Sequence, residues 1–266
     1  MCRLYGVTRA GFYAWRARGQ SLRARQNQAL ALRIEAVHRA SRRTYGSPRV
    51  HRELEQLGCQ VSENRVARLM REHAIKGRVA TIRYSNPSMR RYYACLSNEQ
   101  LDMNVRRPDQ VWVGDITYLK VGTIYRYLAV VMDRYSRRVL GWSLGKRKDV
   151  NLTLRALERA VRNRRPRHGL IFHTDRGIEY AAAVFKQRLA ELGITQSMNR
   201  PGKATDNAYI ESFFHSMKSE AIHGERFSED HQLESALRSY LPFYNHTRLH
   251  SSLNYVPPAT FEKQLA

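Results

Sequence analysis

Cysteine is scarce in this chain: the three cysteines among 266 residues, Cys2, Cys59 and Cys95, lie far apart and form no C-x-x-C pair. This spacing excludes a disulfide scaffold and a cysteine-based zinc site. The chain also lacks an apolar run of about 18 residues and an apolar N-terminal signal segment. We therefore expect a soluble, cytoplasmic protein with reduced thiols and no membrane partner.

Acidic residues are also few. The chain has 23 Asp and Glu against 46 Lys and Arg, which gives a formal net charge of +23. An excess of this size bears on partners rather than on the fold. Nucleic acid is the expected partner because neutralisation of phosphates by Lys and Arg drives its binding. A ribosomal or merely basic protein is the alternative.

The first 80 residues have apolar positions at helical spacing. They predict helices over 22–41, 49–57 and 61–73, with Ser47 and Ser62 as N-caps and Pro48 at a first helical position. A shorter helix is expected before them, capped by Thr8, with aromatic core residues Phe12, Tyr13 and Trp15.

Arginines lie off the apolar stripe of the segment 61–73, among them Arg65 and Arg68. A helix, a short turn and a capped, arginine-rich helix form the layout of a helix-turn-helix, whose second helix enters the major groove of DNA. A plain three-helix bundle with a solvated basic face remains the alternative. We thus expect a short helical segment over 1–20, a helix-turn-helix region over 21–80 and a linker over 81–104.

From residue 111 the pattern changes to β-branched and aromatic runs. Three antiparallel strands are expected, over 111–121, 124–136 and 137–145, and then helices alternate with two short strands near 169–175 and 194–199. This order predicts an α/β fold with a mixed five-stranded sheet flanked by helices. We assign 105–266 to this core and to a helical extension at its C-terminal end.

Three acidic residues of the core are candidates for one site. Asp115 lies within the first strand, Asp175 ends the fourth, and Glu211 lies on the expected helix 206–222. If the two strands are sheet neighbours, the two aspartates meet. Glu211 falls at the margin of that helix's apolar face, on one line with Asn207 and Lys218.

Hard oxygen donors that converge on a phosphate-attracting surface suggest Mg²⁺, and two ions would relieve the repulsion among the carboxylates. Each acid also has a simpler explanation: backbone hydrogen bonds for Asp115, a turn for Asp175 and solvent exposure for Glu211. Other acids nearby have such explanations too: Asp133 can start a turn, Glu179 can start a helix, and Asp206 can be a helix N-cap.

The 35 residues between Asp175 and Glu211, with four extended words, carry a resemblance to a known family. The words are WVGDITYL, FHTDRGIEY, RPGKATDNAYIESFFHSMKSE and FYNHTRLHSSLNYVPPATF. Together they resemble the OrfB-type DDE transposases of the insertion-sequence family numbered three, whose core is similar to that of retroviral integrases. The segments YGSPRVHRELEQLG and SENRVARLMRE resemble that family's helix-turn-helix, so the resemblance covers nearly the whole chain.

The resemblance implies an RNase H-like core in which Asp115, Asp175 and Glu211 are catalytic ligands of two Mg²⁺ ions, with Mn²⁺ as a substitute. It implies that water cleaves a phosphodiester at an element end and that the released 3′-hydroxyl joins a second DNA. It further implies DNA contacts in the core and the helix-turn-helix, and supporting histidines beside the acids. The implied DNA contacts are Lys218, Lys203, Arg200, Asn207, Arg65 and Arg68, and the implied supporting histidines are His173 and His215.

Two departures from related patterns affect the expected partners. The chain has no zinc-binding HHCC module of the retroviral type, and it begins without leucine-zipper heptads. In the resembled family an upstream reading frame supplies such heptads through a frameshift fusion, so we expect that protein or fusion as a partner. Synapsis of two DNA ends implies a homo-oligomer at the bacterial nucleoid. The alternatives are a nuclease of the same fold without joining activity and a DNA-binding regulator with an inactive core.

Overall fold

A computed structural model describes residues 2, 4–78, 104–200 and 204–265. The chain divides into two compact units, 1–78 and 79–266, which are described separately below. The expected linker 81–104 lies, apart from residue 104, outside the described residues. Within the described part of the chain no helix is long and apolar enough to cross a membrane.

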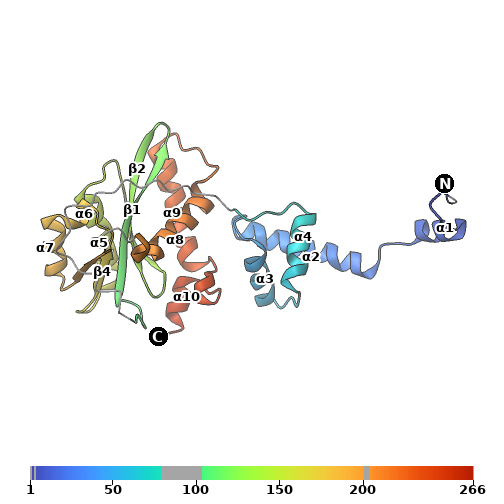
Figure 1. Cartoon of the computed structure of the whole chain (residues 1–266), viewed down its shortest axis with the longest axis horizontal. Coiled ribbons are helices and arrows are strands. Elements are labelled where there is room, and N and C mark those ends of the chain that lie inside the picture. Colours follow the sequence, from blue (N-terminus) through green and yellow to red (C-terminus); the bar gives the residue numbers. More distant parts are fainter. Residues whose placement is uncertain (1, 3, 79–103, 201–203, 266) are drawn as a thin grey trace. The chain divides into compact units, whose positions relative to one another are not determined.

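The first unit is helical (Figure 1). Buried Ile34, Val50, Leu54, Val66 and Leu69 form the contact among its last three helices. Its helices, all close to the expected ranges, are α1 (Arg9–Ala17), α2 (Leu22–Ala40), α3 (Ser47–Gln56) and α4 (Glu63–Glu72).

Helix caps in this unit follow the sequence in two of three places. The hydroxyl of Thr8 accepts a hydrogen bond from the backbone N–H of Gly11, and the Ser62 hydroxyl caps α4. The prediction for Ser47 is wrong, because the N-cap of α3 is Gly46 and no side chain caps that helix. Pro48 in the first turn supplies the fixed φ that starts α3.

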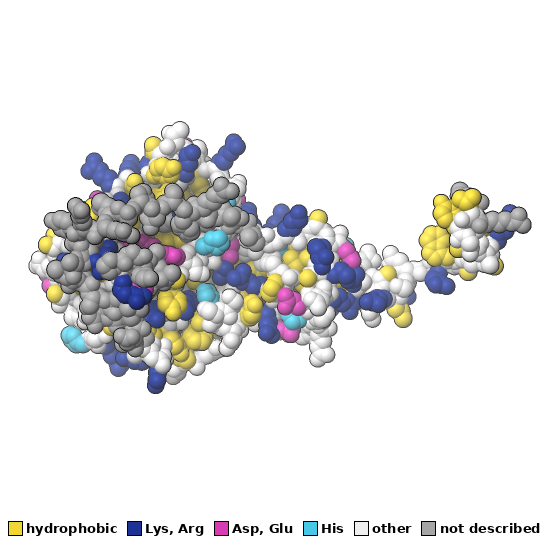
Figure 2. Space-filling view, in the orientation of Figure 1, with side chains coloured by type: hydrophobic (Ala, Val, Ile, Leu, Met, Phe, Trp, Pro, Cys, Tyr) yellow, Lys and Arg dark blue, Asp and Glu magenta, His cyan; other side chains and the backbone are white. Residues whose placement is uncertain are grey.

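The aromatic side chains of α1 are not a core, so that expectation is also wrong. No residue of α1 is buried, and Tyr13 and Trp15 are 62% and 68% exposed. Phe12 packs against these two rings, and Figure 2 shows hydrophobic side chains at the surface of this segment. Nine residues provide one apolar stripe, which needs a second element to cover it.

The second unit is built on a mixed five-stranded sheet with strand order β3-β2-β1-β4-β5, which confirms the expected fold class. The first three strands are antiparallel, whereas β4 pairs parallel to both β1 and β5. The strands are β1 (Val111–Val121), β2 (Ile124–Asp133), β3 (Val139–Gly145), β4 (Ile171–Thr174) and β5 (Thr195–Met198).

Helices cover both faces of this sheet (Figure 1), with α5, α6 and α7 on one face and α8, α9 and α10 on the other. The main core cluster joins Trp112 and Phe172 of the sheet to Leu157 of α5 and Phe185 of α7. These helices are α5 (Val150–Arg164), α6 (Ile178–Ala181), α7 (Ala183–Glu191), α8 (Ala208–Met217), α9 (Asp230–His246) and α10 (Pro258–Lys263). Short 3₁₀ turns form η1 (Ala204–Asn207) and η3 (Ser251–Leu253), and a short π turn forms η2 (Lys218–Ile222).

Two glycines permit the close approaches on which this arrangement depends. A Cβ at Gly114 of β1 would lie 2.7 Å from the Phe172 ring of β4, and one at Gly141 of β3 would lie 2.3 Å from the Ala156 carbonyl oxygen of α5. Real Cβ atoms do not approach so closely. Glycine therefore sets how tightly β1 packs beside the β4 ring and how tightly α5 lies on the sheet.

Candidate active site

Asp115 and Asp175 lie side by side at the junction of β1 and β4. In the parallel register Gly114 is opposite Thr174, so the next residue on each side is one of the two aspartates. An Asp115 Oδ1 accepts from the Ile116 N–H at 2.7 Å, and Asp175 Oδ1 accepts from the Gly177 N–H at 3.0 Å. The two strands are sheet neighbours, which was the condition for the two aspartates to meet.

Glu211 comes from α8, which packs on β1. The buried residues Ile210, Phe213, Phe214 and Met217 are the predicted apolar face, and Glu211 is exposed in the first turn. The helix is shorter than expected: residues 204–207 form a 3₁₀ turn before it, and its end widens into a π turn at 218–222.

The electrostatics of the three acids are coupled. Burial raises the pKa of Asp115 well above its usual range, and the charges of Asp175 and Glu211 raise it further. Burial likewise raises the pKa of Asp175, whereas the pKa of the more exposed Glu211 is raised by partial desolvation and by the charge of Asp175. Among the described residues none of these three carboxylates makes an ion pair. No described side chain forms an ion pair that would stabilise the charged forms of these carboxylates, so a bound cation would do so.

A lysine and a fourth carboxylate lie beside the pair, and neither was assigned to the site from the sequence. Lys148 lowers the pKa of Asp115 and of Asp175 by its charge, although burial outweighs it at both. Its Nζ lies 3.6 Å from Glu179 Oε2, and the Glu179 side chain is only 4% exposed. Oε2 has no hydrogen-bond partner among the described residues.

Glu179 does begin a helix as predicted, since it lies in the first turn of α6. Its carboxylate also approaches Asp175: a Cβ placed on Gly177 would lie 2.9 Å from Glu179 Oε2 and 3.0 Å from Asp175 Oδ1. Burial raises the pKa of the Tyr180 hydroxyl well above its usual range, and the charges of Asp115, Asp175 and Glu179 raise it further. Two features of the sequence could have indicated these residues: the spacing of four between Asp175 and Glu179, and the basic run KRK that ends in Lys148 before α5.

The rival acid Asp133 is explained by local structure. Its Oδ1 accepts hydrogen bonds from the backbone N–H groups of Tyr135 and Ser136, so it shapes the turn after β2. The predicted turn start is confirmed.

Asp206 is not the N-cap of α8, so that prediction is wrong. The N-cap is Asn207, and no side chain caps the helix there. Asp206 instead lies in η1, where its buried carboxylate accepts from the Arg200 backbone N–H and pairs with the Arg200 guanidinium at 2.9 Å. A guanidinium fork offers a carboxylate more donors than one backbone N–H does, and this explains the outcome.

Asn207 and His173 are buried beside the acids. Asn207 is 1% exposed, and its Nδ2 donates to the Gly114 carbonyl oxygen of β1 at 3.2 Å. Each ring nitrogen of His173 has one β5-side partner, Ser197 Oγ at 2.8 Å and Asn199 Oδ1 at 2.7 Å. Burial lowers the His173 pKa to about 4, so the ring is neutral and connects β4 to β5. His215 is exposed on α8.

Lys218 lies just beyond α8 with its Nζ 4.9 Å from the centre of the Tyr118 ring on β1. Burial lowers its pKa, while the charge of Asp115 acts in the opposite direction. Lys218 therefore lies within electrostatic reach of the acids, along the line expected from the helix phase.

A buried ion pair holds the chain after Lys218. Glu220 and Arg248 are both almost inaccessible, their closest contact is 2.7 Å, and the Tyr240 hydroxyl donates to the same carboxylate at 2.9 Å. This pair joins η2 to the segment after α9. Such a satisfied buried pair fixes geometry even where it adds little net stability.

The two arginines predicted to bind DNA from α4 already have partners. The Arg65 guanidinium donates to Asn27 Oδ1 of α2 at 2.8 and 3.1 Å, and Arg68 pairs with Glu72 at 2.8 Å. Both side chains are half-buried, whereas Arg71 on the same helix is exposed. In the core, Arg200 is exposed, and Lys203 lies outside the described residues. The roles of these side chains towards DNA stay predictions.

The donor set suits a divalent cation of the Mg²⁺ class. Within the described residues no three His, Cys, Asp or Glu side chains are close enough to hold a metal ion by themselves. Mg²⁺ does not require such a cage, because it usually keeps several waters and takes one or two carboxylates plus phosphate oxygens. A desolvated aspartate pair without an ion-pair partner fits that preference.

Family models match most of the chain. Residues 105–204 and 192–258 match two models described as "Integrase core domain", and residues 25–83 match one described as "HTH-like domain". Among solved structures, the chain is similar to the HTLV-2 integrase catalytic core domain in complex with magnesium, at 19% identity and a TM-score of 0.43, covering 59% of this chain and 97% of that one. It is also similar to a chain of the simian T-cell lymphotropic virus intasome, at 17% identity and a TM-score of 0.49, covering 79% and 73%.

Curated relatives match over nearly their full length. "Transposase InsF for insertion sequence IS3A" of Escherichia coli K12 is 36% identical over 270 residues, which cover 99% of this chain and 93% of that protein. The "Insertion element IS600 uncharacterized 31 kDa protein" of Shigella sonnei is 33% identical over 276 residues, covering 99% and 98%. Identity at this level along the whole chain shows common descent: the chain belongs to the InsF-type transposases of the IS3 insertion-sequence family, with an integrase core domain.

Proposed function

We propose that the protein cleaves DNA at the ends of an insertion sequence and joins them to a second DNA, with a divalent metal as cofactor. The observation that carries the proposal is the adjacent pair Asp115 and Asp175, whose charge no ion pair among the described residues offsets. Membership of a transposase family supports the same reaction class.

In this proposal Asp115, Asp175 and Glu211 hold Mg²⁺, and Mn²⁺ substitutes for it. The metal would supply Lewis-acid stabilisation of charge at the reacting phosphate. Hydrolysis breaks a P–O3′ bond and leaves a 3′-hydroxyl on the element. That hydroxyl then forms a P–O bond in the target strand and displaces the target's own 3′-oxygen, so the joining step conserves the number of phosphodiester bonds.

The protein's own groups position the DNA in this scheme. Lys218 and Lys148 carry positive charge at the margin of the acids and bind phosphates beside the scissile bond. Asn207 holds the β1 backbone at Gly114, next to Asp115, and His173 fixes β4 before Asp175.

Further DNA contacts are proposed at the exposed guanidinium of Arg200, at Lys203 and on α4. Binding of two element ends requires more than one core, so we also propose a homo-oligomer, assembled with the upstream-frame protein at the bacterial nucleoid.

The decisive experiment is Asp115→Asn in the full chain, assayed with element-end DNA and Mg²⁺. Cleavage and joining should both disappear while DNA affinity stays close to that of the unmodified protein. Mg²⁺ should raise the melting temperature of the unmodified protein but not of the variant, since a ligand stabilises only a state that binds it. Joining by the variant at the normal rate would refute the assignment.

A further inference from the structure

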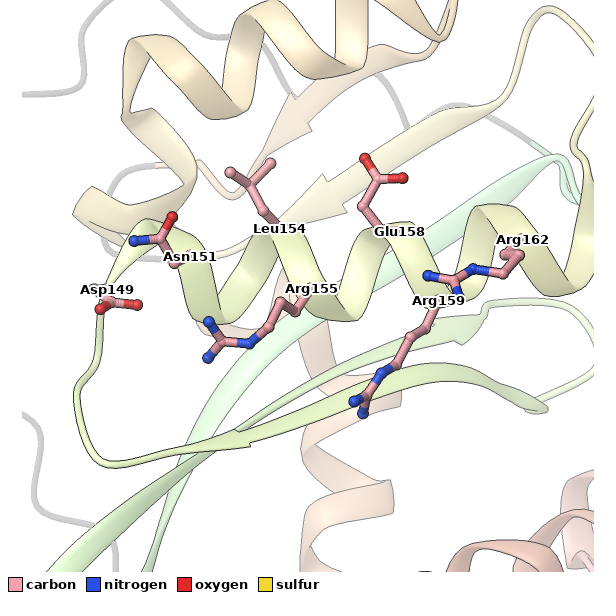
Figure 3. Close-up of a pocket in the computed structure, with 7 residues that line it drawn as sticks. All are labelled: Asp149, Asn151, Leu154, Arg155, Glu158, Arg159 and Arg162. Atoms are coloured by element: carbon pink, nitrogen blue, oxygen red, sulfur yellow. The ribbon is translucent and has the colours of Figure 1, made fainter.

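A second charged surface lies along α5, where arginine side chains extend beside the edge strand β3. A cavity of about 590 Å³ extends along this helix from Asp149 to Arg162 (Figure 3). Three exposed arginines line it, Arg155, Arg159 and Arg162, at helical spacings of four and three. These spacings place the three side chains on one side of the helix.

The acidic residues of the same cavity do not neutralise these arginines. The Glu158 carboxylate pairs with Arg188 of α7 at 2.6 Å, and Asp149 caps α5 by accepting from the Leu152 N–H. Among the described residues none of the three arginines makes an ion pair. Like charges four residues apart destabilise a helix unless an anion offsets them.

Two of the three guanidinium groups are held in place by neutral partners. Arg155 Nε donates to Ser143 Oγ of β3 at 3.1 Å, and Arg159 Nη1 donates to the Trp142 carbonyl oxygen at 2.6 Å. The Arg159 guanidinium also lies 5.6 Å from the centre of the Trp142 ring. Groups fixed from one side keep their remaining N–H donors for a ligand and lose little freedom on binding it.

We propose that this arginine face, Arg155, Arg159 and Arg162, binds the phosphate backbone of double-stranded DNA away from the cleaved end. Seven residues of helix span about 10 Å, which corresponds to several phosphates of one strand at about 3.4 Å of axial rise each. A second copy of this chain fits less well, since the same face of a two-fold partner would present the same uncompensated charges. The inference rests on DNA as the substrate proposed above, but it concerns a surface separate from the acids.

The test compares two triple variants of the full chain. One carries Arg155→Gln, Arg159→Gln and Arg162→Gln; the control carries Lys186→Gln, Arg226→Gln and Lys263→Gln. The control residues are exposed cations elsewhere in the same unit, so both variants lose the same net charge. Binding to a random-sequence duplex without element ends is measured by fluorescence anisotropy over a range of salt concentrations.

The arginine variant should bind the duplex at least about tenfold more weakly at moderate salt. The slope of log K against log salt should fall by about 2.7, because each neutralised phosphate contributes about 0.9. The control should lose much less. Equal losses in both variants would reduce the effect to net charge and overturn the proposal.

Two further readouts separate other outcomes. If the arginine variant sediments as a smaller species while its salt slope is unchanged, the face binds another copy of the chain and the DNA assignment is wrong. Cleavage of element-end DNA by the unmodified protein is measured in parallel. A protein that binds through the arginine face but never cleaves would refute the proposed function and leave this inference standing.

Discussion

The acidic site and the arginine face carry opposite charge within one unit, and they differ in how that charge is compensated. At the acids, burial removes water from Asp115 and Asp175, and the nearby cation Lys148 only partly offsets their charge. On α5 the arginines stay in water, and the nearby acids are used elsewhere. Desolvated charge requires a tightly held counter-ion, whereas solvated charge suits a long, exchangeable polyanion.

The largest expected contrast is between two Asp→Asn changes, one in each region. Asp175→Asn removes a proposed metal ligand and should lower cleavage at least about 10³-fold, since metal-based stabilisation is worth several kcal/mol. Asp149→Asn on α5 keeps its capping hydrogen bond, because Asn caps as well as Asp, and should leave cleavage within about twofold. Single-turnover cleavage of element-end DNA measures both.

The opposite pair of results would contradict the assignment of the chemistry to the acidic site. Loss of cleavage in Asp149→Asn with normal activity in Asp175→Asn would move the chemistry to the α5 side. Asp175→Asn should also be at least as stable as the unmodified chain in metal-free buffer, because one repelling charge is gone.

A smaller effect is expected from Lys148, whose cation is held by buried Glu179. Lys148→Met should lower kcat/KM about 10- to 100-fold, the range of one charge-assisted hydrogen bond to phosphate. Glu179→Gln should lower it less, because Lys148 remains but is no longer held in place. The double variant should be no worse than Lys148→Met alone, since the two residues act together.

Lys146→Met is the matched control for that cycle. Lys146 is an exposed lysine of the same β3–α5 connection, and its charge acts on Asp230 rather than on the acids. It should change kcat/KM by less than about threefold. Additive losses from Lys148→Met and Glu179→Gln would show that Glu179 does not act through Lys148.

The sequence predicts the sheet and two of the acids well because local signals and topology agree there. The turn at Gly122 and the turn set by Asp133 bound the strands, and the parallel register then places Asp115 next to Asp175. Helix phase predicted the place of Glu211 beside the apolar face of α8, because that face is continuous, whereas its role as a metal ligand rests on the family resemblance and stays a prediction.

Other features depend on contacts that the sequence does not express. Glu179 has the pattern of an ordinary first-turn acid, and only the packing of α6 buries it beside Asp175. Asp206, predicted as a helix cap, instead pairs with Arg200, six residues earlier. The aromatic residues of α1 have the spacing of a core, but no described element buries them. In each case a tertiary contact overrides a local preference.

The packing of α5 on the sheet, which positions the arginine face, can be tested through stability. Gly141→Ala places a Cβ against the α5 backbone and should cost about 1–3 kcal/mol of unfolding free energy, as overpacking does. Gly19→Ala meets no atom within 4 Å and should change it by less than about 0.5 kcal/mol. Chemical denaturation measures both.

Displacement of α5 should also weaken duplex binding by the Gly141→Ala protein while cleavage per folded molecule stays near normal. If cleavage fell together with binding, the arginine face and the acids would be one coupled site and not two.

The smallest expected effect concerns Glu158, which tests whether the acids of α5 are as fully engaged as their contacts indicate. Glu158→Gln removes one exposed pair with Arg188, and Arg188 keeps Glu191 at 3.0 Å. The loss of stability should be about 0.2–1 kcal/mol, the usual value for an exposed ion pair. Duplex affinity should rise less than about twofold, because the carboxylate already faces Arg188 and not the arginine face. A rise of tenfold or more would mean that Glu158 screens Arg155 and Arg159, and the face would then be partly neutralised from within.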